Sequence, residues 1–312
     1  MQEKIIVKPN KKNRIKTSVS RKVFNVCNII IMILLSITFL APYINILAKA
    51  FNSAKDTMLG GITFYPRVFS LDNFSVVLHD ESTWTGAQIS VLRVVTGSLL
   101  SLLLQYAAAY VLLRKGLPFK RGIIIFLTIP MFVNGGLISE YIIYGKLNIY
   151  NTFFVYILPN AFSFYNMVVI RTYLQGIPES LCESARLDGA GEFTILMRIM
   201  LPLSMPIVAT ILLWCAVGHW NDWTTSMYFV RDRSLFTLQY NLQLAAKEAE
   251  VLQSMIADAI ASGRPLGDIS TDISGESIQA AQIIVTTLPI LCVYPFVQKY
   301  FVSGVMLGSV KE

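Results

Sequence analysis

The residues best suited to binding a solute lie close to breaks in long apolar segments. In the run GHWNDW at 218–223, Trp220 and Trp223 flank Asn221 and Asp222. Aromatic rings can stack on the apolar faces of a sugar, and amide or carboxylate groups can hydrogen-bond its hydroxyls. Tryptophans near a membrane surface also serve, and more commonly, as interfacial anchors. The run therefore predicts either a sugar-binding site or part of an aromatic belt.

A second set of polar residues interrupts two neighbouring apolar segments. Asn134-Gly135-Gly136 follows Pro130, and Tyr165-Asn166 lies in the next segment. Loosened backbone at membrane depth is tolerated only where it is buried in protein or faces a water-filled cavity. These breaks predict either a solute pathway or packing kinks. The candidate pathway residues are Asn134, Gly135, Gly136, Tyr165, Asn166, Trp220, Asn221 and Trp223.

The sequence contains no arrangement of residues typical of an enzyme. Its two histidines, His79 and His219, are far apart, and its four cysteines form neither a CxxC motif nor a Cys/His cluster. A GxxxxGK[ST] phosphate loop, HExxH and GxSxG are all absent. We therefore predict no catalytic residue, no metal site and no cofactor on this chain. Any ATP hydrolysis through a phosphate loop must occur on another protein.

Composition places the chain in a membrane. Of the 312 residues, 54% are hydrophobic and 14% are charged, whereas a soluble domain carries roughly 25% charged residues. The net charge of +7 comes mainly from Lys and Arg at the flanks of apolar segments, which favours membrane orientation over nucleic-acid binding. The first apolar run is too long for a signal peptide and lacks an A-x-A-like cleavage site, so we expect an uncleaved first span.

Six segments are long and apolar enough to cross a membrane. They are residues 23–48, 89–113, 122–144, 152–170, 203–220 and 280–301. The sequence thus predicts an all-α, polytopic membrane protein with one six-span domain at 23–303. A basic segment, 1–22, precedes this domain, and a tail, 304–312, follows it.

The distribution of basic residues predicts the orientation of these spans. Residues 1–22 contain eight Lys/Arg, and 114–121 (RKGLPFKR) contains four. The positive-inside rule places both stretches, the 174–202 segment and both termini in the cytoplasm. The long loop at 221–279 then lies outside, where its length predicts contact with a partner. Residues 241–261 of this loop are predicted to be helical.

Two polar residues lie within the second predicted span. Arg93 is near its outer end, where an arginine usually snorkels to the interface. Gln105 is isolated among apolar residues, and it predicts either a helix–helix hydrogen bond or a pathway residue.

The cytoplasmic stretch 178–202 reads PESLCESARLDGAGEFTILMRIMLP. Its spacing resembles the EAA signature, EAA-x3-G-x9-I-x-LP, of binding-protein-dependent ABC importer permeases, with Ser184 in place of the second alanine. The segments NGGLISEYI, ILPNAFSFYNMVVIRTYLQGIPESL and AVGHWNDWTTSMYFVRDRSLFTLQ are similar to the carbohydrate-uptake permeases, in particular to the branch associated with oligosaccharides and polysaccharides. The resemblance extends from the second span to the C-terminus.

This resemblance implies an ABC type I importer permease fold with a cytoplasmic EAA coupling loop at 174–202. The implied ATPase-coupling residues are Glu183, Ser184, Ala185, Asp188, Gly189, Ile199, Leu201 and Pro202. The implied partners are a second homologous permease, two ATPase subunits that carry ATP and Mg, and an extracytoplasmic solute-binding protein. The protein would lie in the cell membrane and pass a carbohydrate, such as an oligosaccharide, by alternating access.

Three alternatives remain open from the sequence: an ion-coupled stand-alone transporter, an ABC permease for a non-sugar solute, and a membrane enzyme or scaffold. An ion-coupled transporter usually carries an acid or an acid–histidine relay at the membrane midplane. No such relay is evident in the predicted spans, which favours the ATP-driven importer.

Overall fold

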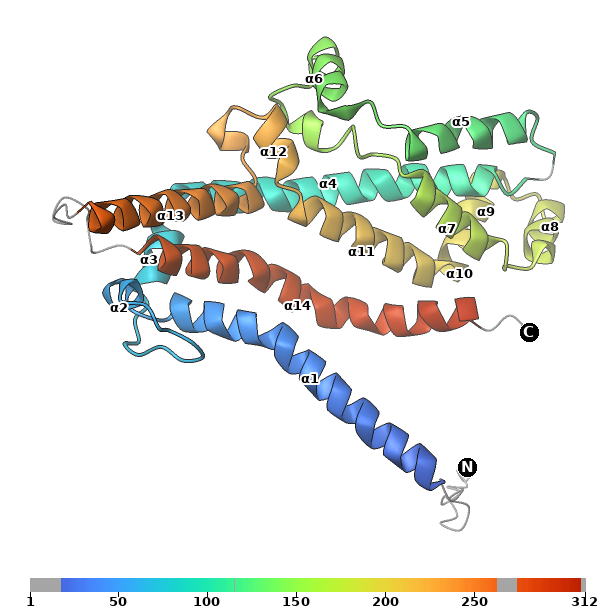
Figure 1. Ribbon diagram of the computed structural model, residues 1–312. Coiled ribbons are helices and arrows are strands. Elements are labelled where there is room, and N and C mark those ends of the chain that lie inside the picture. The colour runs from blue at the N-terminus through green and yellow to red at the C-terminus, as the bar shows by residue number, and fades with distance from the viewer. Residues whose placement is uncertain (1–17, 115, 263–273, 310–312) are drawn as a thin grey trace, which may run out of the picture.

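The computed structural model describes residues 18–114, 116–262 and 274–309. These residues form helices joined by loops (Figure 1). The three longest helices are α1 (Val19–Ala50), α4 (Glu81–Val111) and α14 (Gly275–Ser309). The other α-helices are α2 (Ala54–Met58), α3 (Asp72–His79), α5 (Lys120–Phe132), α6 (Gly136–Lys146), α7 (Phe164–Leu174), α8 (Glu179–Leu187), α9 (Glu192–Ile195), α10 (Leu201–Leu203), α11 (Met205–Asn221), α12 (Thr224–Phe229) and α13 (Leu238–Ala261). Two 3₁₀ turns, η1 (Phe153–Tyr156) and η3 (Arg233–Leu235), and one π-helical turn, η2 (Leu196–Met200), complete the described elements.

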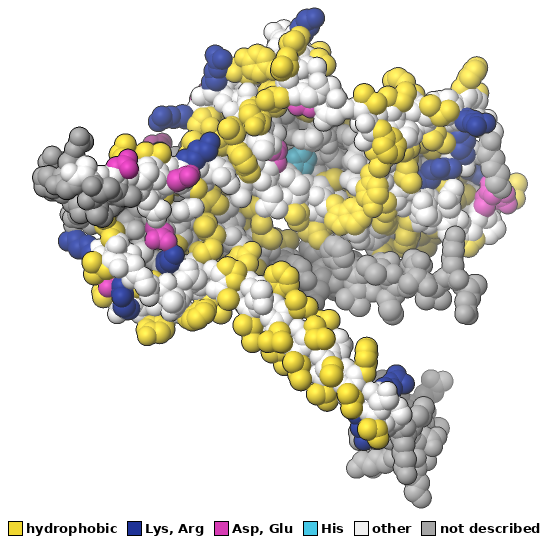
Figure 2. All heavy atoms as spheres, viewed as in Figure 1, with side chains coloured by type: hydrophobic (Ala, Val, Ile, Leu, Met, Phe, Trp, Pro, Cys, Tyr) yellow, Lys and Arg dark blue, Asp and Glu magenta, His cyan; other side chains and the backbone are white. Residues whose placement is uncertain are grey.

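Helix α1 stands apart from the rest of the molecule along most of its length. Its C-terminal end packs on α14, and its N-terminal part diverges from the bundle (Figure 1). The most apolar 18-residue stretch of α1 has none of its residues buried, and hydrophobic side chains cover this helix in Figure 2. An apolar surface of this kind is expected where a helix faces lipid or another membrane helix.

Three described helices are long and apolar enough to cross a membrane, and two bent helix pairs raise this number to five. The prediction of six spans is therefore not confirmed. The segment predicted at 152–170 is not one continuous helix: it forms η1, an irregular stretch at 157–163 and the first part of α7. Pro159 in that stretch has no N–H to donate to a helix. Helix α7 has 11 residues, a length of about 16 Å, against about 30 Å of bilayer core.

The predicted break in the third apolar segment is confirmed. Helices α5 and α6 meet at an angle of 116° across residues 133–135. Asn134 caps the break because its Oδ1 accepts a hydrogen bond of 2.8 Å from the amide of Gly136. Gly136 has φ +74°, a conformation that suits glycine. Pro130 lies inside α5 without ending it.

The described residues after α11 form several helices. The prediction of a helix over 241–261 is confirmed by α13, which packs along α4 and α14. The amide of Leu238 donates to Ser90 Oγ at 2.9 Å, and Asn241 Nδ2 donates to the carbonyl of Ser82 at 2.8 Å. These bonds fix the start of α13 on α4. Residues 263–273 of this loop, like residues 1–17 of the basic segment, lie outside the described residues.

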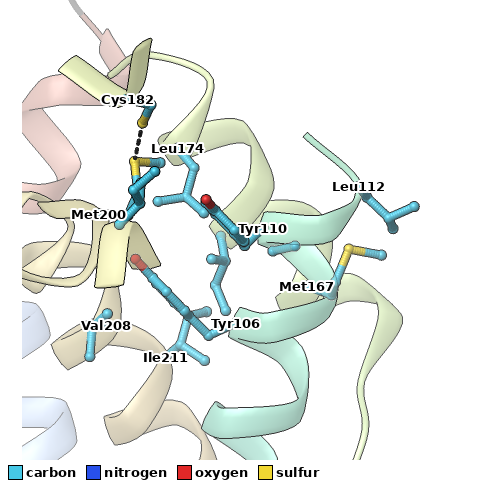
Figure 3. Packing of buried hydrophobic residues seen from close by; sticks show 12 residues of the cluster. Tyr106, Tyr110, Leu112, Met167, Leu174, Cys182, Met200, Val208 and Ile211 are labelled. Atoms are coloured by element: carbon cyan, nitrogen blue, oxygen red, sulfur yellow. Dashed lines mark hydrogen bonds between the residues drawn. The ribbon is translucent and has the colours of Figure 1, made fainter. Parts of the chain in front are cut away.

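The largest buried cluster joins α4 to the predicted EAA segment (Figure 3). Tyr106 and Tyr110 of α4 pack with Met200 and with the buried side chains of α7 and α11. The hydroxyl of Tyr106 lies 2.7 Å from Ser204 Oγ, between α10 and α11. This cluster positions the α8–α10 segment at one end of α4.

Candidate functional site

A polar cavity of about 680 Å³ lies among α4, α6, α7, α11 and α12. Amides, hydroxyls and charged groups converge on this space, together with apolar side chains such as Leu137 and Val155. The polar lining residues are Arg93, Ser101, Gln105, Asn134, Glu140, Asn160, Ser163, Asn166, His219, Asp222, Thr224 and Thr225. Such a mixture can hydrogen-bond a hydroxyl-rich solute.

A buried ion pair forms one wall of the cavity. Arg93 of α4 is 0% exposed, and its Nη2 contacts Asp222 Oδ2 while its Nη1 donates to the Asp222 carbonyl at 2.8 Å. The guanidinium also lies over the ring of Tyr156, 4.7 Å from its centroid. The expectation that Arg93 snorkels to the interface is therefore wrong. A carboxylate 129 residues away in the sequence provides the partner that permits its burial.

Asp222 is itself held by the turn that follows α11. Its Oδ1 accepts from Thr224 Oγ1 at 2.7 Å and from the amide of Thr225 at 3.1 Å. Its Oδ2 accepts from Thr225 Oγ1 at 2.6 Å in addition to Arg93. Both carboxylate oxygens of Asp222 thus accept hydrogen bonds, and the Arg93–Asp222 ion pair fixes the start of α12 against α4.

Helices α4 and α11 approach one another closely beside this ion pair. His219 is buried, and its ring packs directly on Gly97. A Cβ built on Gly97 would lie 2.5 Å from His219 Nε2, which is far inside van der Waals contact. Glycine at this position is therefore what permits the crossing of the two helices.

Gln105 marks the part of the cavity deeper along α4. Its side chain is 1% exposed, and its Oε1 has no hydrogen-bond partner in the described structure. Nearby, Asn166 Nδ2 has one long contact of 3.8 Å to Cys215 Sγ. Unsatisfied amide groups of this kind are expensive to bury unless something else completes them.

The predicted pathway residues divide into two groups. Asn134, Gly136 and Asn166 line the cavity. The remaining predicted residues, Gly135, Tyr165, Trp220, Asn221 and Trp223, are not among its lining residues. The indole of Trp220 donates to the carbonyl of Thr286 on α14 at 3.3 Å, and the ring of Tyr165 stacks on Trp214.

Four cavity-lining residues were not predicted as pathway residues: Arg93, Glu140, His219 and Asp222. One signal could have identified two of them. Opposite charges at Arg93 and Asp222, each near the same end of an apolar segment, are compatible with a pair. Within the described residues, no group of three His, Cys, Asp or Glu side chains could hold a metal ion.

The predicted EAA segment folds as a helix, a tight turn and a second helical run. Helix α8 ends at Leu187, and Gly189 follows with φ +82°. The amide of Ala190 then donates to the carbonyl of Ala185 at 2.9 Å. Only glycine adopts this left-handed conformation without strain, so Gly189 determines how the chain turns from α8 into α9.

The eight predicted coupling residues do not all share one surface. Glu183, Ser184, Asp188, Gly189 and Pro202 are exposed. The side chains of Ala185, Ile199 and Leu201 are half-buried and pack against the cluster in Figure 3. The most exposed large apolar residues of α8 and α9 are Leu187, at 88%, and Phe193, at 70%.

Glu192 joins the EAA segment to α4 through three hydrogen-bond donors. Its Oε1 accepts from Arg114 Nη2 at 2.6 Å and from Arg186 Nε at 3.1 Å, and its Oε2 accepts from the hydroxyl of Tyr110 at 2.6 Å. The hydrogen bonds from Arg114 and then Tyr110 and Arg186 lower the pKa of Glu192 to about 2. We call these four residues the Glu192 clasp. The clasp connects α8 and α9 to the end of α4.

Comparison with known proteins identifies what this architecture is similar to. Residues 97–306 match the protein family described as "Binding-protein-dependent transport system inner membrane component". Two relatives from Bacillus subtilis (strain 168) are each 30% identical to the chain. The "Polygalacturonan/rhamnogalacturonan transport system permease protein YtcP" aligns over 90% of this chain and 95% of the relative, and "Protein LplC" aligns over 93% and 95%.

A solved structure also matches. It is a bacterial ABC transporter "involved in the import of the acidic polysaccharide alginate", 27% identical, with a TM-score of 0.80 over 91% of this chain and 99% of the matched one. The agreement covers nearly the whole length of both chains. The helical architecture of Figure 1 is therefore that of an importer permease.

Proposed function

The chain belongs to the family of binding-protein-dependent transport system inner membrane components, and we propose that it is the permease subunit of an ATP-driven importer that carries a carbohydrate. The family description gives the membrane location and the dependence on a binding protein. The named substrates of the relative YtcP and of the matched importer are carbohydrates, which supports a carbohydrate here. An oligosaccharide is the form we propose.

The polar cavity is the observation that carries the choice of substrate class. The bundle contains an open cavity of about 680 Å³ whose lining combines carboxamide, hydroxyl and carboxylate groups with apolar side chains. Sugar hydroxyls are donors and acceptors that match such groups. An apolar solute would leave the lining groups that lack a protein partner, such as Gln105 Oε1, unsatisfied, which is costly for a buried group.

The EAA segment is the proposed site of coupling to a separate ATPase. Helix α8 presents Glu183 and the turn at Gly189 on an exposed surface, and Leu187 and Phe193 extend from it. Exposed apolar side chains of this size suit burial in a groove on a partner. The Glu192 clasp would transmit movement of α8 to α4, which carries Arg93 and Gln105 into the cavity.

In the proposed transport cycle, movement of α8 is passed to the helices that line the cavity. Closure of an ATPase dimer on ATP and Mg would shift α8, and the clasp and the cluster around Tyr106 would move α4 and α11 as one body. The cavity would open alternately to the two sides of the membrane. The sugar would exchange hydrogen bonds with water for those with the lining, and no covalent bond would change.

The remaining features of the assembly are proposed from the same resemblance. We place both termini and the 174–202 segment in the cytoplasm, and the loop at 221–279 outside. The partners would be a second homologous permease, two ATPase subunits and an extracytoplasmic solute-binding protein. Helix α13, which is anchored on α4 at Leu238 and Asn241, would lie on the side from which the binding protein delivers the sugar.

Purification and transport together test this function. The chain carrying an affinity tag should co-purify from its own membranes with a second permease and an ATPase, and the purified assembly should accumulate oligosaccharide in proteoliposomes only with ATP. Uptake by this chain alone, driven by a proton or sodium gradient, would refute the proposal in favour of an ion-coupled transporter.

A further inference from the structure

The charged groups of the cavity do not favour an acidic sugar. Arg93 is the one basic residue among its described lining residues, whereas Glu140 and Asp222 are both acidic. The formal charges of these three side chains sum to −1. A carboxylate on the solute would add to this negative charge.

The positive charge of Arg93 is already matched within the protein. Two of its nitrogens contact Asp222, and the face of its guanidinium lies 4.7 Å from the Tyr156 ring centroid. Asp222 is fixed in turn by Thr224 and Thr225. Binding of a uronate by the Nη atoms of Arg93 would have to displace a half-buried carboxylate that accepts four hydrogen bonds from Arg93, Thr224 and Thr225, which is costly. The arginine thus holds the cavity wall and does not supply a free cation.

The unsatisfied groups of the cavity are amide groups and the Nε of Arg93, which is buried without a hydrogen-bond partner. Gln105 Oε1 is a buried acceptor without a partner, and the Asn166 amide has only the long contact to Cys215. A hydroxyl donates to such an oxygen, and a carboxylate cannot do so when ionised. The free hydrogen-bonding capacity of the site is therefore complementary to a neutral sugar unit.

From this arrangement we propose that the cavity selects an uncharged sugar unit over a uronate, with Gln105 Oε1 accepting a hydrogen bond from a sugar hydroxyl. This inference rests on the proposed function and specifies the substrate class of the same site. It also distinguishes the chain from the matched importer, whose named substrate is an acidic polysaccharide.

Equilibrium binding to the assembled importer tests this selection without the solute-binding protein. The complex, purified through a tag on this chain and held in nanodiscs with a non-hydrolysable ATP analogue, is titrated with labelled arabinopentaose, maltopentaose and pentagalacturonate at about 0.15 M salt. We expect the uronate to bind at least tenfold more weakly than the better neutral sugar. Equal or tighter binding of the uronate would overturn the proposal.

Variants of one residue test the role of the amide. Gln105→Met keeps the side-chain length but removes the acceptor, and it should weaken neutral-sugar binding about five- to tenfold, as expected for one hydrogen bond. Gln105→Glu keeps an acceptor oxygen, so it should retain neutral-sugar binding and weaken uronate binding further. Thr96→Ala is the matched control, because Thr96 lies on the same helix and its hydroxyl bonds only the Leu92 carbonyl of that helix.

The outcomes separate this proposal from the one on which it rests. Unchanged neutral-sugar binding in Gln105→Met would remove Gln105 from the site. Tight uronate binding would overturn the charge selection and leave carbohydrate import intact. If none of the three pentasaccharides bound or was transported, carbohydrate import itself would be refuted.

Discussion

Replacement of Asp222 by Asn should destabilise the permease strongly, although the new side chain has nearly the same shape. The change leaves the guanidinium of Arg93, which is 0% exposed, without a counter-charge. Removing one partner of a buried pair typically costs about 3–5 kcal/mol. Asp222 keeps 20% of its side chain exposed, so water can reach the site, and we take the lower limit of about 3 kcal/mol. That corresponds to a ~150-fold change in the unfolding equilibrium.

A double-mutant cycle separates this charge effect from a general packing defect. Arg93→Met alone leaves Asp222 with its bonds to Thr224 and Thr225, so it should cost less, about 2 kcal/mol. Because the double variant Arg93→Met/Asp222→Asn buries no unpaired charge, it should be more stable than Asp222→Asn alone.

Reversible unfolding in mixed detergent–SDS micelles, followed by tryptophan fluorescence, measures these free energies. The matched control is Thr96→Ala, which should change stability by less than about 0.5 kcal/mol. If Asp222→Asn costs no more than this control, or if the two single variants add without coupling, then Arg93 and Asp222 do not form the buried pair and the cavity wall is wrongly assigned.

Further predictions concern the turn after α8, the Glu192 clasp and the close approach of α4 and α11. Gly189→Asp should abolish ATP-driven uptake but leave the amount of protein in the membrane unchanged. A non-glycine residue at φ +82° costs roughly 1–2 kcal/mol locally and redirects the turn after α8. Uptake assays with immunoblotting of the membrane fraction check this, and normal uptake would show that the turn has no role in coupling. Glu192→Gln should weaken the clasp between α8 and α4. It should therefore lower the amount of sugar taken up per ATP hydrolysed by a larger factor than it lowers the rate of ATP hydrolysis. The Glu192 pKa of about 2 lies below its ordinary value of 4.5, so the carboxylate stabilises the clasp fully above about pH 4.5 and loses this effect only as the pH falls toward 2; a wild-type stability change attributable to Glu192 between pH 5 and 8 would contradict this. Gly97→Ala should destabilise the fold by about 1–3 kcal/mol, because its Cβ would lie 2.5 Å from His219 Nε2, and His219→Ala should restore part of that loss in the same SDS titration.

Local sequence patterns predicted a large part of the architecture correctly. Apolar runs located α1, α4, α11 and α14, because the bilayer imposes a minimum length on a spanning helix. The Asn-Gly-Gly run located the break between α5 and α6, since a glycine with positive φ does not continue a helix. The prediction of one span over 152–170 was wrong in detail: hydropathy there is high, but the chain forms η1, an irregular stretch that contains Pro159, and α7.

The candidate site could be predicted only in part. Asn134, Gly136 and Asn166 were found because each is a polar or small residue within an apolar run. Trp220 was selected for its ring, yet its indole bonds Thr286 of α14, a contact that depends on how two helices distant in sequence pack. Ala185, Ile199 and Leu201 match the EAA pattern, but their side chains contribute to the protein's own core. The roles of the eight coupling residues remain proposals.

The sequence alone determined that the chain lies in a membrane, that its third span is broken and that 178–202 follows the EAA pattern, because composition, backbone freedom and residue spacing are local properties. The tertiary structure decided that Arg93 is buried against Asp222, that His219 rests on Gly97 and that Glu192 ties α9 to α4. Each of these contacts joins residues about 80 to 130 positions apart, and in every case burial and charge pairing depend on the packing of α4 against other helices.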